Sequence, residues 1–248
     1  MKETRIIMGM PITIEIIDSS APQSVFDEVF AYFTYVDETF SIFKSTSEIT
    51  VINEGRLLPA QYSQDMQTVF QLCEETKKDT HGFFDIMTSR GIYDPSGVVK
   101  GWSIAHAADM LAKKGYDNFY VEAGGDIQVC RNDVSLPPWK AGIRNPFNIH
   151  ENIAVLGLWH EAIATSGTYI RGQHIYNPFS PGDELQEIVS LSVIGKNIYD
   201  ADRFATGAFA MQHDGIGFIE QLDDFEGYSI DACGIATKTS GFDQYITT

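Results

Sequence analysis

The sequence predicts an α+β fold, with mostly antiparallel sheets and helices packed on them, in a single domain spanning residues 1–248. Residues 12–17 (ITIEII) and 188–195 (IVSLSVIG) have the patterns of strands, whereas residues 22–43 repeat apolar side chains at helical spacing. No repeat, linker or low-complexity segment divides the sequence. A chain of 248 residues with 44% hydrophobic content can bury a large core.

The first helix is expected within residues 22–43, because its apolar residues recur three and four positions apart. They are Val25, Phe26, Val29, Phe30, Phe33, Val36 and Phe40. A second helix is expected over residues 64–78, with the inward side chains Met66, Val69, Phe70 and Cys73. We interpret the aromatic stripe of the first helix as core and not as a cofactor site.

Residues 94–97 (DPSG) have the composition of a loop. The spacing of Ile104, Ala108 and Leu111 predicts a helix behind this loop, and Gly115 is a plausible stop. A loop and a helix thus lie close in sequence to the glycine turn at residues 124–125.

Residues 118–123 (NFYVEA) predict a strand that leads into Gly124-Gly125-Asp126. The double glycine fits two structures, because glycine adopts positive φ at no steric cost and has no side chain. It is either an ordinary turn between strands or a ligand floor, that is, backbone without side chains against which a ligand lies.

The last third of the chain continues the mixture of strands and helices. Residues 161–182 are strand-like but interrupted by small hydroxyl residues, and residues 200–214 have helical spacing. Residues 228–242 predict a hairpin around Gly234.

Composition excludes several classes of partner. The formal net charge of −17 and the pI near 4.6 oppose binding to nucleic acid or to anionic lipid. No stretch has the length of a membrane span, and the N-terminal residues lack the apolar region of a signal peptide, so we expect a cytoplasmic protein. The three cysteines, Cys73, Cys130 and Cys233, show no metal-binding spacing and are expected to be reduced, buried and structural.

Two patterns could carry chemistry. Asp202 and Thr206 are four residues apart, so on a helix they share one face and offer the hard oxygen ligands that Mg²⁺ prefers. The alternative is a helix-terminal acid beside an exposed threonine. His174 lies in a polar segment and is either a general base or a hydrogen-bonding surface histidine. Lys100 could reach a phosphate, although the Walker spacing is missing.

Taken in order, several motifs resemble the FAD:protein FMN transferases, also called the ApbE flavin transferases. The matching pieces run from about residue 8 to residue 211 and are ETFSIFKSTSEITVIN, HGFFDI, DPSGVVKGWSI, EAGGDI, ATSGTYIRGQHIYNP and ADRFATGAFAM. The resemblance implies an ApbE-like, T-fold-related domain. It also implies Mg²⁺-dependent transfer of FMN from FAD to a threonine or serine hydroxyl of an acceptor flavoprotein, with release of AMP.

The resemblance also implies roles for individual residues. The metal ligands are expected to be Asp202, Thr206 and the backbone carbonyl of Gly97, and the catalytic residues are expected to be His174 and Asp202. Phe43 is expected against the isoalloxazine ring. The full set of expected FAD-binding residues is Ser41, Phe43, Asn53, Ser96, Gly97, Lys100, Glu122, Gly124, Gly125, Asp126, Thr165, Ser166, Gly167 and His174. This implication favours the ligand floor over the ordinary turn at Gly124-Gly125.

The chain departs from the family pattern at several positions. The connection between Asp85 and Lys100 is shorter than in many members, Thr168 replaces a common acid, and Asn177 replaces Asp. Two other functions remain open. One is an FAD-binding protein or Mg²⁺-dependent FAD pyrophosphatase that uses water in place of a protein hydroxyl, and the other is an α+β binding module without flavin.

Overall fold

The computed structural model describes residues 1–18, 21–168 and 175–247. Its strands are β1 (Lys2–Ile7), β2 (Met10–Ile16), β3 (Asn118–Ala123), β4 (Asp126–Arg131), β5 (Trp139–Asn145), β6 (Asn148–Leu158), β7 (Ala162–Gly167), β8 (Ile188–Gly195), β9 (Glu226–Asp231) and β10 (Ala236–Lys238). Its α-helices are α1 (Gln23–Phe40), α2 (Glu48–Asn53), α3 (Gln64–Asp79), α4 (Ser96–Lys113), α5 (Ile198–Ala210) and α6 (Asp214–Glu220).

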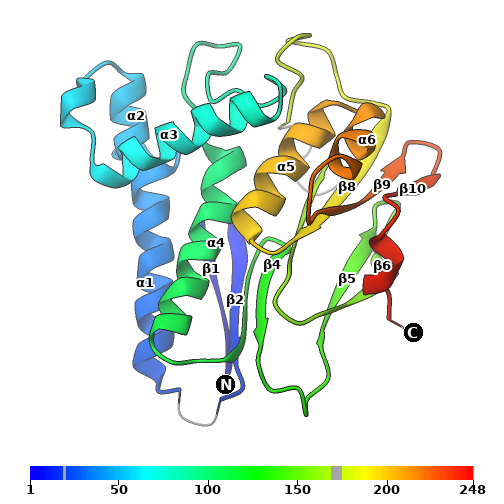
Figure 1. Ribbon diagram of the computed structural model, residues 1–248. Coiled ribbons are helices and arrows are strands. Elements are labelled where there is room, and N and C mark those ends of the chain that lie inside the picture. Colours follow the sequence, from blue (N-terminus) through cyan, green and yellow to red (C-terminus); the bar gives the residue numbers. More distant parts are fainter. Residues whose placement is uncertain (19–20, 169–174, 248) are drawn as a thin grey trace.

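Among the described residues, eight strands form one sheet in the order β1-β2-β3-β4-β7-β8-β9-β10, and β5 pairs with β6 in a separate hairpin. Every neighbouring pair in both sheets is antiparallel. The predicted α+β fold class is therefore confirmed, and Figure 1 shows the helices grouped on one side of the large sheet.

The helix-covered face of the large sheet holds the main core. The apolar side chains of β2 that face α1 and α4 are buried, and so is the stripe of α1 predicted from spacing. The largest fully buried side chains here include Phe26, Phe30 and Phe33 of α1, Ile12 and Ile14 of β2, and Phe119 of β3. Burial of such aromatic and branched side chains contributes about 1.5–3 kcal/mol each to folding. The interpretation of the stripe as core is confirmed.

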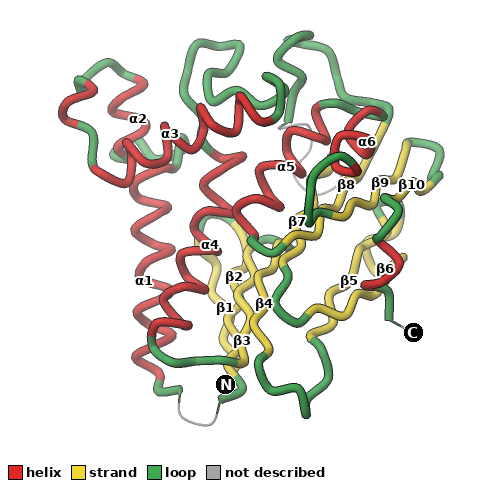
Figure 2. Tube along the Cα trace, viewed as in Figure 1, coloured by secondary structure: helices red, strands yellow, loops and turns green. Residues whose placement is uncertain are grey.

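The hairpin β5–β6 covers part of the opposite face, apart from the helices (Figure 2). Strand β7 serves both cores, because Ala164 faces the helices and Ile163 faces the hairpin. Trp139 of β5 packs edge-on against Tyr120 of β3, with ring centroids 5.0 Å apart. The sheet is thus buried on both faces near its centre.

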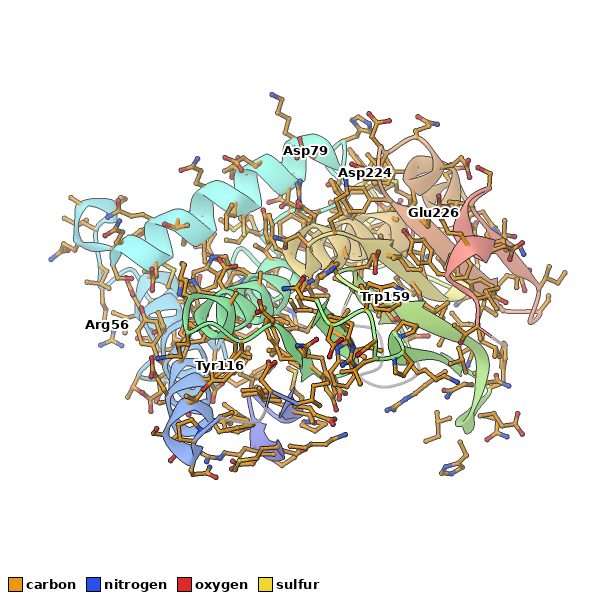
Figure 3. The ribbon with its side chains drawn as sticks, turned by 60° about the horizontal axis from the view of Figure 1, so that its bottom comes forward. Arg56, Asp79, Tyr116, Trp159, Asp224 and Glu226 are labelled. Atoms are coloured by element: carbon orange, nitrogen blue, oxygen red, sulfur yellow. The ribbon has the colours of Figure 1, made fainter. Side chains whose placement is uncertain are left out.

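A third apolar cluster lies where the end of α1, α2, α3 and the first turns of α4 meet. Arg203 of α5 ties this group to the rest of the molecule, because its Nη1 donates to Asp79 Oδ2 at 2.7 Å. Asp79 lies at the end of α3 nearest to α5 (Figure 3). The first turns of α4 and α5 are therefore held between this cluster and the sheet.

Several boundaries differ from the sequence predictions. Ser96 and Gly97, predicted as loop, form the first turn of α4, which has Pro95 at its N-cap position. Strand β1 was not predicted; it is an edge strand, and its alternation is masked because the charged Glu3 and Arg5 lie on its half-buried face while Ile6 is exposed. The six-residue α2 and the strands β5 and β6 were also missed. The predicted strands at 118–123 and 188–195 and the hairpin around Gly234 are confirmed.

The expectation that all three cysteines are buried is wrong. All are free thiols, but Cys73 alone among them is buried, while Cys130 is partly exposed and Cys233 is exposed. Burial raises the pKa of the Cys73 thiol well above its usual range. Within the described residues, no helix has the length and hydropathy needed to cross a bilayer.

Candidate active site

An opening in the large sheet between β4 and β7 forms one side of the site. The described register of these strands comprises Ile127↔Ile163 and Gln128↔Ala162. Beyond it, Asp126 replaces a backbone acceptor, since its Oδ1 accepts a hydrogen bond from the backbone N–H of Thr165 at 3.0 Å. The side chain of Asp126 thus joins the ends of β4 and β7 where backbone pairing between them stops.

The Gly124-Gly125 pair is a turn between strands, and its role as a surface for a ligand stays a prediction. It makes the β3–β4 turn, with φ of +62° and +101°, a region that favours glycine. Gly124 also lines a cavity of about 300 Å³, whereas a Cβ added at Gly125 would meet nothing within 4 Å. Gly125 is therefore required by its backbone conformation and not by close packing.

The cavity lies between the helices and this edge of the sheet. It gathers residues from distant parts of the chain, including ten that were expected at a flavin site: Phe43, Ser96, Gly97, Lys100, Gly124, Thr165, Ser166, Gly167, Asp202 and Thr206. Its other walls come from Phe83, Phe84, Asp85, Thr88, Asp94, Ile175, Tyr176 and Pro178. Aromatic rings, bare backbone and buried charge therefore meet in one cavity.

Three charged side chains meet at the cavity, which Lys100 and Asp202 line and next to which Asp126 lies. Lys100 Nζ lies 2.5 Å from Asp126 Oδ2 and 3.1 Å from Asp202 Oδ1, and the two carboxylates are 1% and 2% exposed. Burial raises the pKa of Asp202 to about 7; Lys100 lowers it and Asp126 raises it further. With both carboxylates ionised, this group of three carries one net negative charge, and both carboxylates are almost fully buried.

Glycine allows α4 and α5 to approach closely at this charged group (Figure 1). A Cβ on Gly101 would lie 2.7 Å from Asp202 Cβ, and the backbone N–H of Gly101 donates to Asp202 Oδ2 at 2.7 Å. A Cβ on Gly97 would lie 3.1 Å from Thr206 Cγ2. The close contact fixes one carboxylate oxygen and leaves the other toward Lys100 and the cavity.

These residues fit a hard divalent cation. Gly97, Asp202 and Thr206, the three expected ligands, all line the cavity, and the buried group beside them has an excess of negative charge. A carboxylate, a hydroxyl and a carbonyl are donors that suit Mg²⁺, which usually completes its shell with water or phosphate oxygens. Across the described ranges, no cluster of three or more His, Cys, Asp or Glu side chains suits a metal, so the site would depend on this mixed set.

The sequence matches the ApbE family over residues 8–93 and 90–229, which together include most of the chain and all of the cavity residues. The chain belongs to the ApbE family.

Among curated members of the ApbE family, a FAD:protein FMN transferase of Vibrio cholerae serotype O1 is 32% identical over 127 residues. That alignment covers 48% of this chain and 38% of the relative. A FAD:protein FMN transferase of Haemophilus influenzae is 26% identical over 159 residues, which cover 59% of this chain and 46% of the relative. The matched region thus spans less than half the length of these curated relatives.

Solved structures of the ApbE family share the fold along the whole chain. The flavin transferase ApbE from Vibrio cholerae superposes with a TM-score of 0.85 at 20% identity, covering 99% of this chain and 98% of that one. The ApbE protein from Thermotoga maritima gives a TM-score of 0.88 at 16% identity, covering 100% and 99%. The arrangement of helices and sheet described above is therefore the ApbE fold.

Some residues expected at the site of this ApbE-family chain lie outside the cavity. The side-chain amide of Asn53 is bound to the backbone of Tyr93, donating to its carbonyl at 2.9 Å and accepting from its N–H at 2.8 Å. Ser41 lines a smaller adjoining hollow together with Phe43 and Met8. Glu122 lies on β3, where burial raises its pKa and Arg144 lowers it. Contacts of these residues with FAD stay predictions.

His174, the expected base, lies outside the described residues. Its neighbours Ile175 and Tyr176 line the cavity. The part that it plays in the reaction therefore also stays a prediction.

Sequence reasoning missed the aromatic wall opposite α4 and α5. Tyr176 Oη lies 3.2 Å from the carbonyl oxygens of both Asp85 and Met87, and its proton can be donated to one of them at a time. The ring of Phe179 packs edge-on against Phe83, with centroids 5.0 Å apart. The motif HGFFDI pointed to this region, but it gave no indication of which residues from 175 onward would pack against it.

Proposed function

We propose that this protein is a Mg²⁺-dependent FAD:protein FMN transferase that attaches FMN to a threonine or serine hydroxyl of an acceptor flavoprotein and releases AMP. The observation that carries the proposal is the cavity itself, in which bare backbone of Gly124 and β7 faces Lys100, Asp202 and Thr206. The names of the curated relatives agree with this chemistry.

The reaction is a displacement at the FMN phosphorus. The acceptor hydroxyl oxygen forms a new bond to this phosphorus, the bond to the bridging oxygen breaks, and AMP leaves with the electron pair. The hydroxyl proton passes to a base, for which His174 is our candidate because an imidazole accepts protons near neutral pH. No oxidant or reductant is needed, since the flavin keeps its redox state.

The residues of the cavity have separate tasks. Gly124 and Gly167 have no side chains and leave room for the phosphates beside the sheet, and Lys100 balances their charge. Phe43, which is 91% exposed, is available to stack on the flavin ring. Asp202, Thr206 and the Gly97 carbonyl would hold Mg²⁺, which when bound withdraws charge from the pyrophosphate.

Intact-mass spectrometry tests the proposal. A candidate acceptor incubated with the protein, FAD and Mg²⁺ gains the mass of one FMN less water, and its Thr→Val variant gains nothing. AMP appears in equal amount. Release of free FMN and AMP with no labelled acceptor would replace the transferase by an FAD pyrophosphatase. FAD that stays intact with every acceptor tried would contradict both activities.

A further inference from the structure

Asp126 makes contacts that set it apart from the other residues expected to bind FAD. Its side chain is 1% exposed, lies against Lys100 and is not among the residues that line the cavity. Its Oδ1 accepts a hydrogen bond from the backbone N–H of Thr165, and its Oδ2 forms an ion pair with Lys100 Nζ without a hydrogen bond of normal geometry. Direct contact between this carboxylate and a ligand would also be electrostatically unfavourable, because a pyrophosphate is an anion.

The ammonium group of Lys100 is shared unequally between two carboxylates. It is 2.5 Å from Asp126 Oδ2 but 3.1 Å from Asp202 Oδ1. The other oxygen of Asp202 is already bound to the N–H of Gly101. Oδ1 of Asp202 is therefore the oxygen that a cation would use, and Lys100 is the group that competes with the cation for it.

We propose that Asp126 is a positioning residue that draws the Lys100 ammonium toward the sheet and so leaves Asp202 Oδ1 accessible to the cation. The inference rests on the proposed Mg²⁺ site and deepens it. If Asp126 loses its charge, Asp202 is the one carboxylate of this pair that still attracts the Lys100 ammonium. A buried pair of opposite charges is strongly held, so a cation must then displace the ammonium before it can bind.

The same carboxylate couples this charge to the geometry of the sheet. Asp126 Oδ1 joins β4 to Thr165 of β7 at the point where the strands no longer pair. One side chain thus sets the position of Lys100 and the width of the opening. An asparagine keeps the oxygen that accepts from Thr165 but loses the charge that holds Lys100, so the two contributions can be separated.

The test is a calorimetric titration of Mg²⁺ into the protein with FAD present. Asp126→Asn is expected to weaken Mg²⁺ binding about tenfold, within the usual range of coupling between sites, and Asp126→Ala to weaken it by a similar factor. The matched control is Asp133→Asn, which removes an exposed aspartate beyond the other end of β4 and leaves the titration unchanged. Mg²⁺ binding that is normal in Asp126→Asn but impaired in Asp126→Ala would overturn the inference.

A double-mutant cycle separates the action through Lys100 from simple loss of negative charge. In a Lys100→Gln background, which keeps a hydrogen-bond donor for the carboxylates, the effect of Asp126→Asn should shrink by about fivefold or more. Equal effects in both backgrounds would overturn the inference while leaving the metal site intact. If the wild-type protein binds no Mg²⁺, the proposed metal is wrong, and the inference is overturned with it.

Discussion

The two walls of the cavity are built differently. On the wall of α4 and α5, glycines bring two helices together around buried charges, and Asp202 is fixed by the N–H of Gly101. On the opposite wall, the chain around Tyr176 is held to residues 85–87 by one phenol and to Phe83 by one pair of rings. The wall of α4 and α5 holds its charged groups in fixed positions, as a reaction requires. The wall around Tyr176 can be altered without disturbing the buried charges.

The largest effect is expected on the charged wall. Asp202→Ala should lower transfer about 10³-fold or more, because phosphoryl transfer depends on neutralising the charge of the transferred group. EDTA should have a comparable effect on the wild type. Rates are measured with saturating FAD, and circular dichroism checks that the fold is retained. Transfer at the wild-type rate in either experiment would remove the metal assignment.

His174→Ala should lower transfer about 10²–10⁴-fold, the usual contribution of a general base. FAD affinity, measured by flavin fluorescence, should change little. A variant that loses FAD binding but keeps its turnover at saturation would identify His174 as a ligand contact and not as a base.

Gly101→Ala tests whether the α4–α5 wall is as closely packed as the distances indicate. The added Cβ must move Asp202 or the backbone of Ile198, whose carbonyl oxygen would lie 2.8 Å away. Overpacking of this kind typically costs about 1–3 kcal/mol of unfolding free energy. Gly217→Ala is the control, since a Cβ there meets nothing within 4 Å. Equal stability of the two variants in denaturant titrations would contradict the close packing.

Tyr176→Phe should have the smallest effect. The substitution removes the phenol hydrogen bond but keeps the ring. Loss of one such hydrogen bond costs about 1 kcal/mol, so we expect FAD affinity to fall roughly fivefold. The dissociation rate of FAD in stopped-flow fluorescence should rise while kcat stays near the wild-type value. A fall in kcat with unchanged affinity would mean that this wall also takes part in the chemistry.

The sequence predicted the parts of the molecule that depend on local periodicity. The aromatic stripe of α1 and the strand at 118–123 follow from spacing, because one face of each element is buried. The strand β1 and the short α2 could not be found this way, since an edge strand and a six-residue helix lack a strong pattern.

The sequence predicted many of the residues that line the cavity but not how these residues contact one another. The motifs placed Lys100, Asp126 and Asp202 together, yet their spacing in sequence cannot show which carboxylate lies closer to the ammonium. Asn53 illustrates the same limit, because a motif position does not reveal that its amide is bound to Tyr93, 40 residues away. Such pairings arise from tertiary contacts alone.

The contact between Gly101 and Asp202 also restricts how this protein can evolve. A larger residue at position 101 can regain its packing most directly through a smaller residue at position 202, and that second change removes the carboxylate. Selection for stability among suppressors of Gly101→Ala should therefore return folded proteins that have lost transfer. At this contact between α4 and α5, a substitution of Gly101 lowers stability and a substitution of Asp202 removes the carboxylate. Neither residue can therefore change independently of the other.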